Sequence, residues 1–223
     1  MSFWRKALAV TWKDALTELR TREVVFTVLV FALLVIVIFN FAFGTTQEAV
    51  ALVGPGILWV TFAFSGVLSL NRAFVAEKDG GCLEGLLAAP ISREAIYVGK
   101  MLGSLLFLVV IEAISLPIFA FLLNLPVASG PLLVTTLLAT IGFVAVGTLF
   151  SALSVNTRAR EMVLPILFLP VVAPVIISAV KASGLALSGG SWGDVGGWLE
   201  IIGAFDVVFV VVSYLIFNYV VEE

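Results

Sequence analysis

The sequence predicts an all-α integral membrane protein with six transmembrane helices. Of its 223 residues, 61% are hydrophobic and only 12% are charged, whereas a soluble domain is about 45–50% apolar and about 25% charged. A helix needs about 20 mostly apolar residues to cross roughly 30 Å of hydrocarbon, and six such windows follow one another along the chain. Runs this long and continuous lack the alternation of a barrel strand, so helices are the expected form.

The windows lie within a single membrane domain, and two of them contain an acidic residue. The expected spans are 24–43, 52–71, 101–123, 132–155, 162–180 and 201–221. Gly54-Pro55-Gly56 is expected to loosen or break the outer end of the second span, and the prolines of the fifth span are expected to kink it. Residues 183–200 are expected to form a glycine-rich external loop, either as part of an aromatic belt or as a lid or docking face.

Basic residues predict the orientation of the bundle. Five Lys or Arg precede the first span, four lie between spans two and three, two lie between spans four and five, and Lys181 alone follows span five. Eleven of the twelve therefore fall on one side, which the positive-inside rule makes cytoplasmic. Both termini are then expected to be cytoplasmic.

The N-terminal residues 1–23 are too long and too charged for the start of a cleavable signal. They predict an amphipathic helix in the membrane interface, either an elbow that braces the first span or a simple anchor to membrane lipids. The residues of its apolar side recur at helical spacing: Phe3, Trp4, Leu8, Trp12, Ala15, Leu16 and Leu19.

Several classes of function are excluded by what the sequence lacks. It has no histidine, so it has no Ser-His-Asp triad, no HExxH zinc site and no imidazole ligand for a haem. A net charge of −3 offers no field for nucleic acid. Gly189–Gly193 fits G-x-S-x-G but lacks a preceding strand, and no Walker A motif is present. Another chain must therefore bind any nucleotide, and we expect no catalysis and no bound cofactor here.

A few residues of the spans are candidates for a substrate path. Glu112, in the middle of the third span, is expected to face the bundle interior, either as structural polar glue or on such a path. The aromatic residues of the second span and the prolines of the fifth favour a path for a bulky apolar solute, with ordinary helix packing as the alternative. Asp206 is expected near the external interface. The candidate set is Trp59, Phe62, Phe64, Glu112, Pro165 and Pro170.

The cytoplasmic segment 72–100 carries the most information. An acidic helical extension is expected to end at Gly80-Gly81, followed by a short amphipathic helix over Cys82–Ala89 that Pro90 terminates. Ser92 is expected to cap the helix that becomes the third span. Leu83, Leu86 and Leu87 would share one side of the short helix, which suits a partner's groove.

This segment resembles the coupling-helix region of ABC-2-type permeases. More narrowly, the chain resembles the CcmB family, the permease subunits of the cytochrome c maturation haem-export complex. The matching stretches are Glu18–Glu23, Leu70-Asn71-Arg72, Gly81–Pro90, Gly99-Lys100 and Glu112 through Leu116-Pro117.

The resemblance implies a permease of the inner (cytoplasmic) membrane that a separate ABC ATPase drives, with haem as the substrate and ATP bound by the partner. Further partners would be a haem-handling membrane subunit, a small single-span subunit and a periplasmic haem chaperone. Haem export through this subunit and ATP-driven release of the haem-loaded chaperone both fit. Residues expected to contact the ATPase are Glu77, Asp79, Cys82, Leu83, Glu84, Leu86, Leu87, Pro90 and Arg93.

Two alternatives stay open at this point. A proton-coupled secondary carrier would use Glu112, although the spans offer few other charges and no visible inverted repeat. A non-transporting membrane scaffold would depend on helix-packing positions such as Gly99 and Gly103.

Overall fold

A computed structural model describes residues 3–21, 23–43, 47–79, 81, 85–86, 88–154 and 160–220. Within these ranges every long element is a helix, as the composition predicts. The seven helices are α1 (Phe3–Thr21), α2 (Glu23–Phe43), α3 (Gln47–Asp79), α5 (Arg93–Leu123), α6 (Gly130–Ser154), α7 (Arg160–Leu187) and α8 (Trp192–Val220).

Six of these helices are long and apolar enough to cross a bilayer. Their candidate spans are Val25–Ala42, Val50–Asn71, Arg93–Leu123, Gly130–Ser154, Pro165–Leu187 and Trp192–Val220. The six-span prediction is therefore confirmed by length and composition, and each span overlaps one predicted window.

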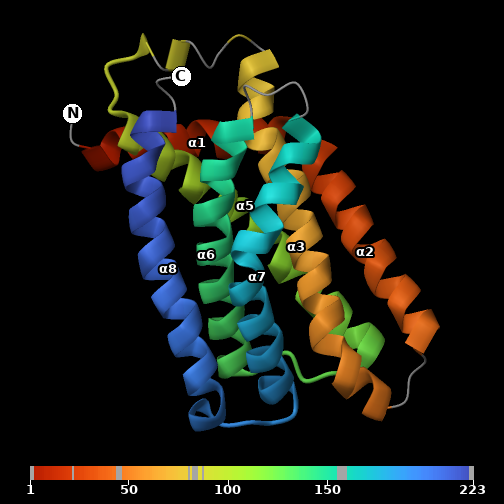
Figure 1. Cartoon of the computed structure of the whole chain (residues 1–223). Coiled ribbons are helices and arrows are strands. Elements are labelled where there is room, and N and C mark those ends of the chain that lie inside the picture. The colour runs from red at the N-terminus through yellow and green to blue at the C-terminus, as the bar shows by residue number, and fades with distance from the viewer. Residues whose placement is uncertain are drawn as a thin grey trace.

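The six long helices form one bundle, and α1 lies across one end of it (Figure 1). We call this end the α1 end. Phe3 begins α1 and Val220 ends α8, and both of these helix ends lie there. α6 packs against α7 and α8, α3 packs against α2 and α7, and α5 contacts α1 as well as the other spans around it.

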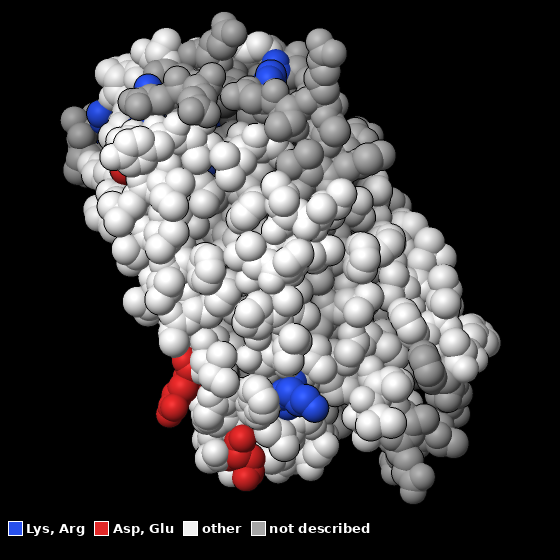
Figure 2. All heavy atoms as spheres, in the orientation of Figure 1, with Lys and Arg blue, Asp and Glu red and all other residues white. Residues whose placement is uncertain are grey.

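Charged side chains are unevenly distributed along the bundle. On the face that Figure 2 shows, the described charged residues gather near the two ends of the molecule, and a broad band between them carries uncharged side chains. Such a band matches the hydrocarbon layer of a bilayer.

The buried apolar residues form two clusters stacked along the bundle. One cluster, toward the α1 end, includes Tyr97, Phe143, Phe168 and Phe217. The other, toward the opposite end, includes Trp59, Phe62, Phe119 and Leu132. Phe143 and Phe168 meet edge to face with ring centroids 4.7 Å apart, which fixes α6 against α7.

The helix through Gly54-Pro55-Gly56 is continuous, so the predicted break in the second span is wrong. α3 runs from Gln47 through Pro55 without interruption. Pro55 removes one backbone donor, but its ring is buried against α7, where a Cβ added to Gly184 would lie 3.5 Å from Pro55 Cγ. Packing on a glycine therefore holds the proline inside the helix. The prolines of α7, Pro165, Pro170 and Pro174, are likewise inside one helix.

The helices extend beyond several predicted boundaries. α8 begins at Trp192, so the expected external loop over 183–200 is reduced to residues 188–191 between α7 and α8. The start of α8 is capped by Asp194, whose carboxylate accepts hydrogen bonds of 2.8 Å from both the backbone N–H and the hydroxyl of Ser191. Gly189, with φ +82°, makes the turn before it.

Candidate functional site

The segment predicted to contact an ATPase lies at the α1 end, and only part of it is described. The side chains of Glu77 and Asp79, and all of Cys82–Glu84 and Leu87, fall outside the described residues. The prediction of a helix over 82–89 therefore remains an expectation. Of the remaining contact residues, Leu86 packs against the first core cluster and Pro90 is exposed.

The two ends of this segment have defined geometry. After α3, the N–H of Gly81 donates to the carbonyl of Lys78 at 3.0 Å, and Gly81 takes a φ of +67° that favours glycine. This turn agrees with the predicted end of the helical extension at Gly80-Gly81. Before α5, Ser92 occupies the N-cap position with extended backbone, but its side chain makes no capping bond. Its carbonyl instead accepts from Ala95 and Ile96, at 3.0 and 3.2 Å.

Arg93 ties the first residue of α5 to the last turn of α8. Its guanidinium Nη1 donates to the backbone carbonyl of Asn218 at 3.2 Å. One turn further along α5, the buried Tyr97 hydroxyl donates to the carbonyl of Ala145 on α6 at 3.0 Å. The Tyr97 ring also packs on Phe217, with centroids 5.3 Å apart. The beginning of α5 is thus fixed to α6 and α8 by polar and aromatic contacts.

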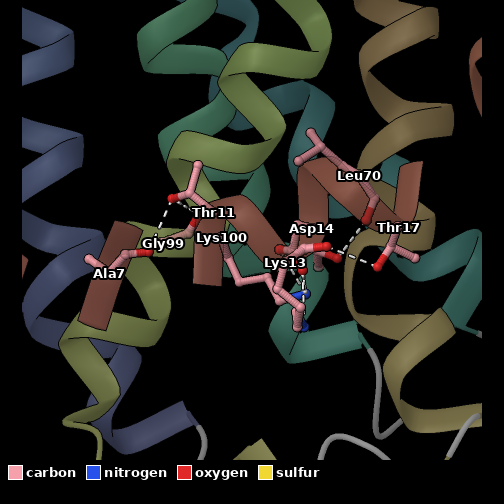
Figure 3. Close-up of polar contacts among 9 residues, drawn as sticks. Ala7, Thr11, Lys13, Asp14, Thr17, Leu70, Gly99 and Lys100 are labelled. Atoms are coloured by element: carbon pink, nitrogen blue, oxygen red, sulfur yellow. Dashed lines mark hydrogen bonds and ion pairs between the residues drawn. The ribbon is translucent and has the colours of Figure 1, made fainter. Parts of the chain in front are cut away.

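α1 is attached to the same part of α5 by a buried ion pair. The Lys100 ammonium lies 3.1 Å from Asp14 Oδ2, and the two side chains are 2% and 22% exposed. The exposed Lys13 lies 3.0 Å from the other carboxylate oxygen of Asp14. Figure 3 shows these three side chains converging where α1 crosses α5. Lys100 also lies over the ring of Phe74 on α3, 5.2 Å from its centroid.

The crossing is close because α5 presents glycines to α1. A Cβ added to Gly99 would lie 2.6 Å from Val10 Cβ and 2.7 Å from the Ala7 carbonyl oxygen. The Thr11 hydroxyl approaches the Gly99 carbonyl at 3.0 Å (Figure 3). Spacing of small residues four apart, Gly99 and Gly103, lets two helix backbones meet in this way.

The side of α1 that packs on the bundle is not its aromatic side. Ala7, Val10 and Thr11 are buried against α5, whereas Trp4, Leu8 and Trp12 are 54–67% exposed. The exposed stripe points away from the protein at the end of the bundle that α1 crosses. This leaves the predicted apolar side free for an interface, and a second, small-residue side contacts protein.

The predicted substrate-path residues do not gather around one space. Trp59 and Phe62 are buried between helices, and the Trp59 indole Nε1 donates to the Ser183 hydroxyl on α7 at 2.9 Å. Phe64 is 50% exposed and faces Phe31 on α2, with centroids 6.2 Å apart. On α7, Pro170 is exposed and Pro165 partly buried. The structure thus spreads these residues over the inside and outside of the bundle.

Glu112 faces the bundle interior, as the sequence predicts. It is buried, and the Thr140 hydroxyl on α6 lies 2.5 Å from its Oε1. The same hydroxyl lies 2.8 Å from the Thr136 carbonyl. Thr140 is the donor in its contact with Glu112. This arrangement joins α5 to α6.

Asp206 lies in the middle of α8, so its expected place near the external interface is wrong. α8 starts at Trp192 and ends at Val220, which puts Asp206 equally far from both ends. Its carboxylate is buried without a hydrogen-bond partner among the described residues and packs on Gly142 of α6. The span continues through the charged Glu200 back to Trp192, which moves Asp206 to its centre.

Comparison with known proteins adds the family. The model of the family described as "CcmB protein" matches residues 5–222. The chain belongs to the CcmB family. A protein named "Heme exporter protein B" from Haemophilus influenzae is 31% identical to it over 214 residues, 92% of each chain. Proteins of the same name from Rhodobacter capsulatus and Paracoccus denitrificans are 33% and 34% identical, over 71% and 69% of this chain and 76% and 71% of their own.

The residues that join helices in this CcmB protein were mostly absent from the sequence-based candidates. Asp14, Thr140 and Ser183 are ordinary polar residues in the sequence, and only the fold brings them to Lys100, Glu112 and Trp59. Gly99 and Gly103 did carry a usable pattern, because glycines four apart in an apolar helix indicate a close helix crossing. That pattern marks where α1 docks, although it does not name the partner helix.

Proposed function

We propose that this chain is the membrane-spanning permease subunit of an ABC transporter that a separate ATPase subunit drives during haem export for cytochrome c maturation. The match to the CcmB family over residues 5–222 carries this proposal, and the relatives named heme exporter protein B support the substrate. The six candidate spans suit a permease. The protein then resides in the inner membrane, with the α1 end in the cytoplasm as the basic residues predict.

The division of labour in this complex follows from what the chain contains. Its sequence has no nucleotide-binding motif, so the partner ATPase binds ATP. It has no histidine, so a haem-handling membrane subunit and a periplasmic haem chaperone supply any imidazole ligands. A small single-span subunit completes the set of proposed partners.

The docking surface for the ATPase is proposed in segment 72–100. Pro90 lies just before α5, and Arg93 is the first residue of α5. The first turn of α5 contacts α6 and α8 through Tyr97 and Arg93. A force applied at this segment therefore acts directly on the packed spans, which is what a coupling element requires.

Co-purification tests the proposal. The tagged chain is expressed with its candidate ATPase and partner subunits, extracted in a mild detergent, and analysed for bound protein, haem absorbance and ATP turnover. We expect the ATPase to co-purify and its turnover to depend on the permease. Charge reversal at Glu84 and Arg93 together should abolish association, whereas reversal of the exposed Lys181, near the far end of α7, should not. Unchanged assembly and ATP turnover in the double variant would show that the docking surface is elsewhere.

A further inference from the structure

Lys100 carries a buried ammonium on a spanning helix, and a charge in that position requires specific contacts that stabilise it. It is 2% exposed, and Asp14, whose carboxylate lies 3.1 Å from the ammonium, comes from α1. This ion pair attaches α1 to this position on α5. A simple interfacial anchor would not need a buried charge pair with a span.

The contact between α1 and α5 is made at three places along α1. Near its start, the Lys6 ammonium donates to the Pro90 carbonyl, in the described stretch 88–92 just before α5. In its middle, Ala7, Val10 and Thr11 lie directly on Gly99. One turn later Asp14 meets Lys100, and a Cβ on Gly103 would lie 3.4 Å from Asp14 Cβ. α1 thus contacts this stretch at Pro90, Gly99, Lys100 and Gly103.

α1 is also connected to α2, the helix that follows it in the chain. α1 ends at Thr21 and α2 begins at Glu23, so the two helices are almost continuous in the chain. Only 17% of the residues in the α2 span are buried, against 72% for α6. Its far end is tied to α5 again, because the Asn40 amide donates to the Leu122 carbonyl at 2.8 Å. α2 packs on α3 and α5, so a movement of α1 and α5 reaches it through its contact with α5 as well as through the chain.

We propose that the Asp14–Lys100 pair is a positioning pair that makes α1 and the first turns of α5 move as one piece, so that a displacement of residues 88–92 by the ATPase carries α1 and α2 with it. This inference rests on the proposed function. It gives α1 the role of a lever, in addition to that of a membrane anchor, and it assigns the motif residues Gly99 and Lys100 a place in force transmission.

The first test measures ATP turnover and haem delivery separately. Lys100→Met keeps the size and apolar stem of the side chain and removes the buried charge, while Asp14 keeps Lys13 as a partner, so this variant should fold and assemble. We expect ATP turnover of the purified complex within about twofold of wild type and at least a fivefold loss of haem attached to a reporter c-type cytochrome per ATP hydrolysed. Lys13→Met, which removes only the exposed partner of Asp14, is the matched control and should stay near wild type.

The second test uses a reversible disulfide between α1 and α5, which we call the staple. In a Cys82→Ser background, D14C/G103C places two Cβ atoms near 3.4 Å, at the short edge of disulfide geometry, and K100M is added so that both tests use the same substitution at position 100. If α1 and α5 move as one piece, the oxidised protein should recover haem delivery per ATP, and reduction should remove it again. The single-cysteine variant D14C/K100M should not respond to oxidation.

The outcomes distinguish this inference from the proposed function. Wild-type haem delivery per ATP in Lys100→Met would overturn the lever. An oxidised staple that formed, as thiol titration shows, but stopped delivery would also overturn it, because α1 would then have to slide on α5. Failure of the wild-type chain to associate with any ATPase would instead overturn the proposed function itself.

Discussion

Trp59 on α3 donates a hydrogen bond of 2.9 Å from its indole Nε1 to the hydroxyl of Ser183 on α7, and both side chains are buried. The neighbouring turn brings Pro55 onto Gly184. The hydrogen bond joins two residues that are 124 positions apart in the chain. Together with the contact of Pro55 on Gly184, it forms a specific junction between α3 and α7. Aromatic residues in the second span thus build the bundle here.

This junction predicts a measurable coupling. Ser183→Ala leaves the buried indole N–H without its acceptor, which should cost about 1–3 kcal/mol of unfolding free energy. Trp59→Phe removes the donor and some volume. The double variant should lose less than the sum of the two single losses, because the hydroxyl is no longer needed once the indole is gone. Equilibrium unfolding in mixed micelles measures this cycle, and strict additivity would show that the two residues do not interact.

Glu112 predicts a near-neutral amide substitution. Gln has a side-chain carbonyl oxygen that can accept from the Thr140 hydroxyl as Glu112 Oε1 does, so Glu112→Gln should keep the contact with Thr140 and retain haem delivery within about twofold. Thr140→Val removes the contact from the α6 side and should cost about 1–2 kcal/mol of stability. A proton-coupled carrier makes the opposite prediction for Glu112→Gln, namely loss of transport together with its pH dependence.

Gly66 and Gly56 on α3 make a matched pair for helix packing. A Cβ on Gly66 would lie 2.9 Å from Cζ of Phe143 and closer still to Cε1 of that ring, whereas nothing lies within 4 Å of a Cβ on Gly56. Phe143 is itself held against Phe168, so it has little room to move. We expect Gly66→Ala to destabilise by about 1–3 kcal/mol and Gly56→Ala to be neutral or stabilising, as thermal unfolding in detergent would reveal. Equal effects at the two positions would contradict this packing.

The two sides of α1 predict opposite tolerance at neighbouring positions. Ala7 is fully buried against α5, so Ala7→Leu should displace α1 and lower the melting temperature clearly. Leu8 is 54% exposed, so Leu8→Ala should leave the melting temperature within a degree or two and weaken only the contact with lipid. If Leu8→Ala were the more damaging change, the aromatic side would be the one that contacts protein.

Much of this fold could be predicted from the sequence, because long apolar windows are a strong indicator of spanning helices. The boundaries were less predictable. The predicted cap at Ser92 agrees with the start of α5 at Arg93, but the sequence does not show that Lys100, beyond the predicted edge of the third span, lies buried against Asp14. Asp206 is likewise buried, in the middle of α8, and hydropathy treats every charge as a boundary and cannot show which charges are buried.

The side of α1 that docks was also beyond a hydrophobicity pattern. Ala7, Val10 and Thr11 are small and carry a weak apolar pattern next to Trp4, Leu8 and Trp12. What places them on α5 is the absence of side chains at Gly99, which is a property of the other helix. Sequence periodicity describes one helix at a time, so it indicates the exposed aromatic stripe and not the contact with protein.

The ion pair between α1 and α5 has a consequence for how the chain is made. Asp14 and Lys100 are 86 residues apart, so the carboxylate is synthesised well before its partner exists. During that interval two intervening spans, α2 and α3, must enter the bilayer, and α1 has no docking site on the protein. Its stripe of Trp4, Leu8 and Trp12 gives it a resting place on the lipid surface until α5 arrives.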